Sequence, residues 1–302
     1  SSIAYTLVMP KNMVKAVLEE AAHTIDRFDA EVLLAHIFHQ SRTWLLAHGE
    51  EAVTSAQHRR YRSLVVRRAR AEPVAYLIGE TSFYAKPFFT DPRALIPRPE
   101  TEDLVTRGLD MVRMHPETWA VWDVGTGSGV IAVSLACCEP RLVVLASDIS
   151  SDAIRLARKN ARRHHARIKY IHANLLDESV KQALIRAGRS HLLMVANLPY
   201  VPFSEKKGLM SDVRDYEPHQ ALFAPQRGTG TILRWLKQIA RWQSGLAWII
   251  LLECDPSHAT KIHRQAKNFF PQAKVQILKD IYHRNRFVEI QSAALMKEAI
   301  GS

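Results

Sequence analysis

The residues AVWDVGTGSG, at positions 120–129, decide the fold of this chain. Their first half, Ala120 to Val124, is a mostly apolar run of the kind that forms a buried strand, and their second half places a glycine at every other position up to Gly129. A helix is predicted directly afterwards, from Ile131 to Cys138. Glycines at this spacing let a ligand approach the backbone closely, and the helix N-terminus supplies N–H groups for an anion. The stretch therefore predicts a ligand-binding loop between a strand and a helix.

The glycine spacing argues against the dinucleotide-binding fingerprint, G-x-G-x-x-G, because Val130 occupies the position of its last glycine. The next strand candidate, Val143 to Ser147, is followed by Asp148. A carboxylate at the end of this strand can accept hydrogen bonds from both hydroxyls of a ribose. A ribose site without a cradle for a pyrophosphate points away from NAD and toward S-adenosylmethionine.

Strand and helix candidates alternate past residue 119, which predicts a mostly parallel sheet with helices on both faces. The tail adds two strand candidates separated by a mostly polar segment, and they predict a closing antiparallel pair. The seven strand candidates are residues 120–124, 143–147, 169–172, 192–196, 247–252, 275–278 and 287–290.

The sequence before the α/β region divides into two further parts. Residues 1–72 carry apolar side chains at helical spacing and predict a small helical domain, in which Asp29 caps the second helix and Ser55 starts the last one. Residues 73–94 are rich in aromatic and β-prone side chains and predict a hairpin linker. The α/β domain then covers residues 95–302.

The net charge of the 302-residue chain is +11, which indicates either an acidic or nucleic-acid-rich environment or a charge that serves only solubility. Both interpretations stay open. Arginines crowd the last predicted helix of the helical domain, where they face either an acidic or ribosomal partner or only solvent. These arginines are Arg59, Arg60, Arg62, Arg67, Arg68 and Arg70.

The three cysteines form no C-x-x-C pair, so we expect neither a disulfide framework nor a metal site, and we expect a reducing compartment. The longest strongly apolar run, Leu246 to Leu252, is far shorter than the roughly 20 residues of a membrane-spanning helix. We therefore expect a cytoplasmic protein without a membrane partner. The mitochondrial matrix, after removal of a presequence, is the alternative. No heptad pattern is present, and we expect a monomer.

A second stretch that carries chemistry is Asn197-Leu198-Pro199-Tyr200, which follows the strand candidate at 192–196. Ligands of open parallel sheets bind at the carboxyl ends of the strands. The side-chain oxygen of Asn197 and the carbonyl of Leu198 are acceptors for the two N–H bonds of a flat NH2 group, on which Tyr200 can stack. The stretch therefore predicts a clamp that holds a planar NH2 group.

The motif D-x-G-x-G-x-G, followed by an acidic residue at the end of the next strand, resembles the Rossmann-like S-adenosylmethionine methyltransferases. The resemblance implies a seven-stranded methyltransferase sheet in which Asp148 binds the ribose. Asn174 and Leu175 stand where such enzymes often place an Asp that accepts from the adenine amino group, and the carboxamide oxygen of Asn174 can still accept. The resemblance places the methionine end of the cofactor along Asp123, Gly125, Thr126, Gly127, Ser128 and Gly129.

The Asn-Leu-Pro-Tyr motif is similar to the N-P-P-Y signature of methyltransferases that act on planar NH2 groups, and it departs from that signature at Leu198. A leucine keeps the backbone carbonyl but lacks the rigidity of proline. The same four residues also occur in enzymes that resemble the ribosomal RNA adenine dimethyltransferases. An adenine-N6 methyltransferase acting on RNA or DNA is therefore one alternative, and a non-catalytic, ribosome-associated module that binds the cofactor is another.

Further stretches resemble the release factor glutamine methyltransferases, the PrmC/HemK family. The resemblance implies methyl transfer to the side-chain amide nitrogen (N5) of the glutamine in the Gly-Gly-Gln loop of class-I peptide chain release factors. It extends over nearly the whole chain, which makes it more specific than any single motif. The stretches are DAEVLL at 29–34, EPVAYLIG at 72–79 with Phe83, LIPRPETE at 95–102 and VRDYEPHQAL at 213–222.

The family resemblance also implies roles for single residues. Phe83 would face the methionine part of the cofactor, and Asn197 would contact both the cofactor and the substrate glutamine. Residues 198–200 would line the substrate slot. The wall of the pocket would be shaped by Arg98, Glu100, Glu217 and Pro218, for which a purely structural role is an equal alternative.

Overall fold

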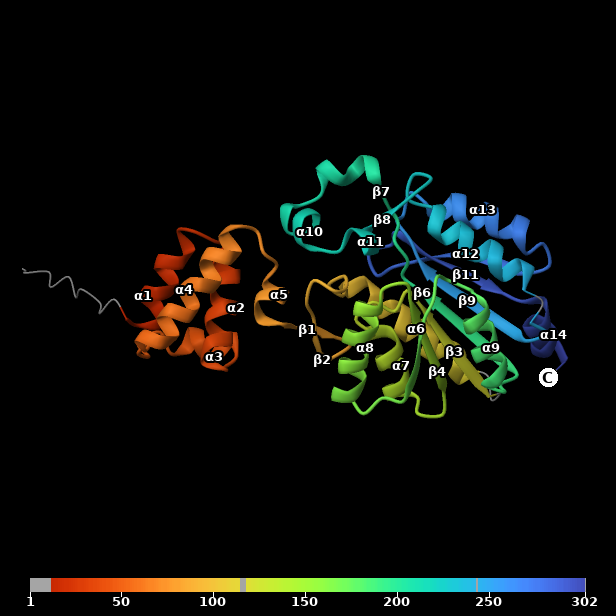
Figure 1. The fold of residues 1–302 in the computed structure, drawn as a ribbon, viewed down its shortest axis with the longest axis horizontal. Helices are drawn as coiled ribbons and strands as arrows, with labels where there is room; N and C mark the ends of the chain where they lie inside the picture. Colours follow the sequence, from red (N-terminus) through yellow and green to blue (C-terminus); the bar gives the residue numbers. More distant parts are fainter. Residues whose placement is uncertain (1–11, 115–117, 243, 302) are drawn as a thin grey trace, which may run out of the picture. The chain divides into compact units, whose positions relative to one another are not determined.

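The computed structural model describes residues 12–114, 118–242 and 244–301, and Figure 1 shows its ribbon. The described residues form two compact units. One unit runs up to Gly79 and also contains Ser211–Tyr216, a segment that comes much later in the chain. The other unit contains Glu80–Met210 and the residues from Glu217 onward. Each unit has a hydrophobic core of its own.

Helices build the first unit, as the sequence predicts. Its core contains Leu33, Leu34 and Leu45, which are fully buried. The hydroxyl of Tyr61 donates to the carbonyl of Ala30 at 3.0 Å and so joins the fourth helix to the second. The helices are α1 (Val14–Ala22), α2 (Arg27–Phe38), α3 (Arg42–Ala47), α4 (Ser55–Ala69), α5 (Val74–Ile78) and α10 (Ser211–Tyr216).

The start of α2 differs from the prediction. The side chain of Asp26 accepts from the backbone N–H two residues on, at 2.8 Å, so Asp26 is the N-cap and the prediction of Asp29 was wrong. Asp29 lies in the first turn of the helix and accepts from Arg68 Nε at 2.7 Å. Helix α4 begins at Ser55, as predicted.

The hairpin is narrower than the predicted linker at 73–94. Its strands are β1 (Glu80–Phe83) and β2 (Lys86–Phe89), and both lie in the second unit. Helix α5 precedes them, is capped by Gly79 and belongs to the helical unit. An apolar run of five residues fits a short helix as well as a strand, so periodicity does not separate the two. The helical unit consequently extends beyond the boundary predicted at residue 72.

A seven-stranded sheet forms the centre of the second unit (Figure 1), in the order β10-β11-β9-β6-β3-β4-β5. The five strands from β9 to β5 in this order run parallel, whereas β11 is antiparallel to both β9 and β10. The predicted Rossmann-like sheet and its closing antiparallel pair are thereby confirmed. The strands are β3 (Trp119–Val124), β4 (Val143–Asp148), β5 (Ile168–His172), β6 (His191–Ala196), β9 (Ala247–Glu253), β10 (Lys274–Lys279) and β11 (Asn285–Gln291).

Helices cover both faces of this sheet. Side chains of α9 (Glu178–Arg186), α12 (Gly230–Arg241) and α13 (Ala259–Phe269) pack against one face, in a core that contains Trp122 and Trp235. The core on the other face takes side chains from α6 (Glu102–Met114), α7 (Val130–Cys138), α8 (Ser151–Arg163) and α14 (Ala293–Gly301). Within the described ranges, no helix is long and apolar enough to span a membrane.

The order of the strands reverses at β3, which has β4 on one side and β6 on the other. The chain places β4 and β5 on one side of β3 and then returns to place β6 on the other side. This reversal opens a crevice at the carboxyl ends of these strands, where α/β proteins bind ligands. Short elements surround this edge of the sheet: η1 (Pro99–Thr101), β7 (Val201–Pro202), η2 (Phe203–Gly208), α11 (His219–Leu222) and β8 (Phe223–Ala224).

Candidate active site

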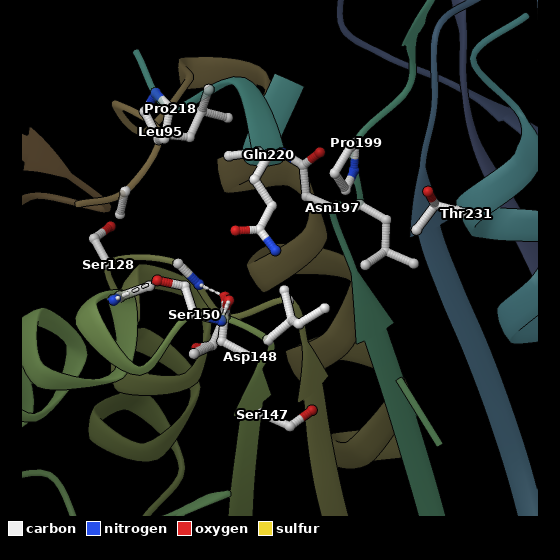
Figure 2. A pocket seen from close by; sticks show the side chains of 18 of the residues that line it. Leu95, Ser128, Ser147, Asp148, Ser150, Asn197, Pro199, Pro218, Gln220 and Thr231 are labelled. Carbon is white, nitrogen blue, oxygen red and sulfur yellow. Dashed lines mark hydrogen bonds between the residues drawn. The ribbon is translucent and has the colours of Figure 1, made fainter. Parts of the chain in front are cut away.

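A cavity of about 460 Å³ lies at the carboxyl ends of β3, β4 and β6, within the second unit. Its size falls in the range of small-molecule sites, roughly 300–1,000 Å³. Figure 2 shows the cavity with its lining side chains. The predicted residues that line it are Gly125, Thr126, Gly127, Ser128, Asp148, Asn174, Leu175, Asn197, Leu198 and Pro199. Of the residues predicted to touch cofactor or substrate, Phe83, Asp123, Gly129 and Tyr200 are not part of this lining.

The glycine loop owes its shape to positive backbone angles and close approaches. Gly125 and Gly127 have φ angles of 69° and 54°, in the left-handed region that glycine adopts without strain. A Cβ on Gly125 would lie 2.9 Å from Cδ2 of Leu198, a distance too short for two carbon atoms. The loop therefore leaves its backbone exposed to the cavity and lies directly against the leucine of the second motif.

Asp123 and Gly129 support the loop from behind. The Asp123 carboxylate is fully buried and accepts from the Thr126 hydroxyl at 2.6 Å and from the Ala132 N–H at 3.2 Å. Burial raises the pKa of this carboxyl to about 7, and the negative charge of Asp148 acts in the same direction. At Gly129, a Cβ would lie 2.9 Å from that of Ala157, so α7 and α8 approach each other through the glycine.

Asp148 ends β4 and presents its carboxylate to the cavity. One oxygen accepts from the Gly127 N–H at 2.8 Å and the other from the Ser150 N–H at 2.8 Å. Burial raises the pKa of this carboxyl even though the backbone N–H groups oppose the change. Each oxygen has a further lone pair, so the two together can accept from a pair of neighbouring hydroxyls. Figure 2 shows the side-chain amide of Gln220 pointing into the cavity toward Asp148.

Asn174 has a partner that the sequence did not indicate. Its side-chain oxygen accepts from Arg234 Nη2 at 3.3 Å, and both residues line the cavity. Leu175 follows with a φ angle of 60° and is buried. The carboxamide oxygen at this end of the cavity is therefore already shared with a guanidinium group.

The second motif divides between cavity and core. Asn197 and Pro199 line the cavity beside Leu198, whose side chain is buried and packs into the sheet core. The Asn197 amide donates through Nδ2 to the hydroxyl oxygen of Thr101 at 2.9 Å. Tyr200 donates through its hydroxyl to Glu253 Oε1 at 3.4 Å, and burial raises the pKa of its phenol.

Glu253 and Thr101 are functional candidates that sequence reasoning missed. Glu253 ends β9 and is buried, and its Oε2 accepts from the Thr101 hydroxyl at 2.8 Å. Burial raises the pKa of the Glu253 carboxyl to about 7, with Glu100 acting in the same direction and Arg286 against it. Only the structure shows the place of Thr101 and Glu253: β9 is the neighbour of β6, so the carboxyl end of β9 lies beside Asn197.

Of the four residues predicted to shape the pocket wall, only Arg98 and Pro218 line the cavity. Glu217 is buried and accepts from the Ile96 N–H at 3.0 Å and from Arg98 Nη2 at 2.5 Å, which fixes the segment before α6. Glu100 is outside the lining and pairs with Arg284 at 3.4 Å.

Phe83 lies in the core and not at the cavity. Only 1% of its surface is exposed, and its ring packs edge-on against Phe88 with 6.1 Å between the ring centroids. A cofactor contact through this side chain would require a rearrangement of the hairpin. Across the part of the chain that the structure describes, no group of three or more His, Cys, Asp or Glu side chains is placed to hold a metal ion.

The donor and acceptor chemistry of the cavity is asymmetric. One end offers the carboxylate of Asp148, which suits a polar ligand with hydroxyls, while the N–H groups of Gly125, Thr126 and Gly127 already donate within the protein. The other end offers the carboxamide of Asn197, whose oxygen suits a group with N–H donors. Both ends border one cavity, so two bound groups can meet inside it.

Two family models match the chain. The PrmC N-terminal domain matches residues 12–79, and the methyltransferase small domain matches residues 106–185. The first match falls in the helical unit and the second in the unit that contains the sheet.

Curated relatives with the name "Release factor glutamine methyltransferase" cover most of the chain. The protein of that name from Koribacter versatilis (strain Ellin345) is 36% identical over 246 residues, which are 82% of this chain and 85% of that protein. Its counterpart from Staphylococcus aureus (strain NCTC 8325 / PS 47) is 30% identical over 285 residues, or 92% of this chain and 98% of that protein. Among solved structures, the hMettl16 catalytic domain shares the fold, with a TM-score of 0.52 at 14% identity over 80% of this chain and 82% of that chain.

Proposed function

Because the chain belongs to the family of release factor glutamine methyltransferases, we propose that it methylates the N5 side-chain amide of the glutamine in the Gly-Gly-Gln motif of class-I peptide chain release factors. The methyl donor in this proposal is S-adenosylmethionine. The reaction makes one N–C bond and breaks one S–C bond, and the amide nitrogen releases a proton to water.

One observation carries this proposal. Asn197 and Leu198, at the end of β6, border the same cavity as the glycine loop and Asp148. Methyl transfer passes directly from sulfur to nitrogen, so donor and acceptor sites must share one space. Aligning two reacting groups in such a space removes much of the entropic barrier to their reaction.

The residues at the first end of the cavity fit S-adenosylmethionine. The free lone pairs of Asp148 suit the two ribose hydroxyls, and Gly127, where a Cβ would meet only Ala94 at 3.9 Å, leaves room for the methionine part beside the backbone. The adenine amino group would share the Asn174 oxygen with Arg234. When bound, the cofactor supplies an electrophilic methyl group on a positively charged sulfur.

The residues at the second end suit a primary amide. The Asn197 oxygen and the Leu198 carbonyl would each accept one N–H bond of the glutamine amide, hold its plane and draw electron density onto its nitrogen. Apolar side chains, including Leu95, Pro199 and Phe203, contribute to the same lining. A site with little water favours the transition state, because methyl transfer disperses the positive charge of the sulfonium.

The remaining parts of the chain complete the proposal. The helical unit that runs up to Gly79 would dock the release factor, and the unit that begins at Glu80 and contains the hairpin and the sheet would carry out the methyl transfer. The protein would act as a monomer in the cytoplasm, or in the mitochondrial matrix after removal of a presequence. Direct binding of nucleic acid is not required for this reaction.

Mass spectrometry of the Gly-Gly-Gln peptide tests the proposal. The purified protein is incubated with a class-I release factor and S-adenosylmethionine, and we expect one added methyl group on the glutamine. A release factor with the glutamine replaced by glutamate is the matched control and should remain unmodified. Asn197→Ala should abolish turnover while cofactor binding survives, an outcome that excludes a non-catalytic cofactor-binding module.

Methylation of adenine in RNA or DNA is the second candidate function, and Leu198 is the observation that favours it, together with the net charge of +11. Parallel reactions with labelled cofactor and ribosomal RNA separate the two candidates. Label that enters the RNA and leaves the release factor unmodified would overturn the main proposal.

A further inference from the structure

We propose that Thr101 and Glu253 form a relay that orients the carboxamide of Asn197, so that its oxygen and not its NH2 group faces the acceptor amide. This inference rests on the proposed function, since it concerns the same acceptor end of the cavity. Neither residue takes part in the chemical step. Both act through Asn197 and are positioning residues.

The relay is a continuous chain of hydrogen bonds. The Nδ2 group of Asn197 donates to Thr101 Oγ1 at 2.9 Å, and the Thr101 hydroxyl donates to Glu253 Oε2 at 2.8 Å. The other carboxylate oxygen of Glu253 accepts from the Tyr200 hydroxyl at 3.4 Å. The last residue of the acceptor motif is thus tied to the same carboxylate as the first.

The direction of these bonds follows from the donors that each group possesses. An ionised Glu253 has no proton to give, so the single proton of the Thr101 hydroxyl goes to the carboxylate. Thr101 can then only accept from Asn197, and this requires the NH2 end of the carboxamide. The Asn197 oxygen is left for the cavity, where it can accept from an incoming N–H.

Burial makes this orientation hard to reverse. The exposed fractions of Thr101 and Glu253 are 3% and 1%, so bulk water does not compete for the bonds between them. Turning the Asn197 amide over would direct its oxygen at the Thr101 oxygen, and two buried acceptors without a proton between them are costly. Thr101 ends η1, Asn197 directly follows β6 and Glu253 ends β9, so regular elements of the fold hold the three residues in place.

Protonation of Glu253 would remove the fixed direction of the hydrogen bonds that run from Asn197 through Thr101 to Glu253. A neutral carboxyl can donate to Thr101, whose own proton is then free to point at Asn197, and the amide can turn over. The groups that act on this carboxyl are Tyr200, Arg286 and Glu100, besides Thr101 itself, and its pKa in the folded protein is about 7. The rate should therefore fall as the pH drops below about 7, because the protonated form lacks the orienting charge.

Kinetics of paired variants test the relay. Thr101→Val keeps the shape but removes the hydroxyl, and we expect kcat to fall by about 100-fold, the scale of misplaced reacting groups. Thr101→Ser restores the hydroxyl and should recover most of the rate. Glu253→Gln should lower kcat and abolish the decline below pH 7. Cofactor affinity, measured by calorimetry, should change little in each variant and reports that the fold is intact.

Two matched control variants remove a threonine hydroxyl and a buried glutamate charge at positions outside the relay. Thr106→Val deletes an exposed hydroxyl on α6, and Glu289→Gln neutralises a buried glutamate on β11 whose pKa is likewise raised by burial. Both should keep the wild-type rate and its pH profile. A Thr101→Val enzyme that methylates the release factor at the wild-type rate would overturn the relay, while a wild-type enzyme without activity on the release factor would overturn the proposed function instead.

A readout without substrate tests the relay independently. The side-chain amide signals of Asn197 in ¹⁵N–¹H spectra, identified by their loss in Asn197→Ser, should shift with a midpoint near pH 7. This titration should vanish in Thr101→Val and in Glu253→Gln. Amide signals that titrate unchanged in both variants would show that neither residue orients Asn197.

Discussion

Gly125 and Leu198 are in direct contact, because a Cβ built on the glycine would lie only 2.9 Å from Cδ2 of the leucine. Leu198 stands where the related motif carries proline, and its side chain is 3% exposed. The leucine therefore fills the space next to the glycine loop. Through this contact, the loop proposed to bind the methyl donor and the motif proposed to bind the acceptor are fitted to each other.

We predict that Gly125→Ala lowers the affinity for S-adenosylmethionine at least tenfold. An alanine at a positive φ angle costs about 1–2 kcal/mol, and its Cβ must also displace Leu198. When Leu198 is also replaced by alanine, the steric conflict is absent. Gly125→Ala should then lower the affinity for S-adenosylmethionine by a smaller factor. Calorimetric titration of the wild type, the two single variants and the double variant gives the coupling energy between the two substitutions. We expect this energy to be about 0.5–3 kcal/mol.

Gly188→Ala is the control for backbone strain alone. Gly188 has a φ angle of 61°, and a Cβ there would meet no atom within 4 Å. The variant should bind S-adenosylmethionine like the wild type and be only slightly less stable. Strictly additive effects of Gly125→Ala and Leu198→Ala would show that the contact does not link the two motifs.

Asp148→Asn should weaken binding of S-adenosylmethionine by about 10- to 100-fold, the scale of hydrogen bonds to a charged group. The raised pKa of Asp148 adds a pH dependence to wild-type binding. Because the ionised carboxylate is the better acceptor, the affinity for S-adenosylmethionine should fall as the pH drops through that pKa. The Asp148→Asn variant should lack this pH dependence. Asp152→Asn, in the first turn of α8, is the matched control. Equal affinities of wild type and Asp148→Asn would argue against the ribose site.

The strands of the α/β unit were predictable because most of them are apolar runs of the right length and they alternate with helices. All seven strand candidates form strands of one sheet. Residues 74–78 were not predictable, because a short apolar run fits helix and strand alike. The cap of α2 was missed because aspartates at 26 and 29 offer two starting points, and packing against α4 decides between them.

The candidate site was predictable where a residue follows a strand directly, as Asp148 and Asn197 do. Motif position did not distinguish side chains that line the cavity from those that support it, which is why Asp123 appeared as a cofactor ligand. The pairing of Thr101 with Glu253 could not be predicted, because 152 residues separate them in the chain and only the folded structure brings η1 to the end of β9. Pairings at such a separation leave no periodic trace in a single sequence.

Tyr61→Phe should destabilise the protein by about 1–2 kcal/mol. The hydroxyl of Tyr61 is buried and donates to the Ala30 carbonyl at 3.0 Å, so its removal leaves a buried acceptor without this partner. Urea unfolding followed by circular dichroism measures the loss. Tyr282→Phe removes a hydroxyl from a side chain that is 64% exposed and should change stability by less than about 0.5 kcal/mol. Identical unfolding of Tyr61→Phe and wild type would contradict the expected bond.

The buried carboxyl of Asp123 should make stability depend on pH. Its pKa is about 7 in the folded protein against an ordinary value of 3.8. The folded state therefore holds this proton more tightly than the unfolded state, and the resulting stabilisation is complete below about pH 4 and is lost as the pH rises to about 7.

The Asn side chain of Asp123→Asn has no proton to lose between about pH 4 and 7. The variant should therefore become more stable relative to the wild type as the pH rises. We expect the difference in free energy of unfolding to shift in its favour by about 1.4 kcal/mol per pH unit between pH 5 and 7, and to level off above. Subtracting wild-type values cancels the titration of the other groups. A difference that stays constant from pH 5 to 8 would mean that Asp123 is ionised throughout, and that Thr126 and the α7 N-terminus stabilise its charge more than burial opposes it.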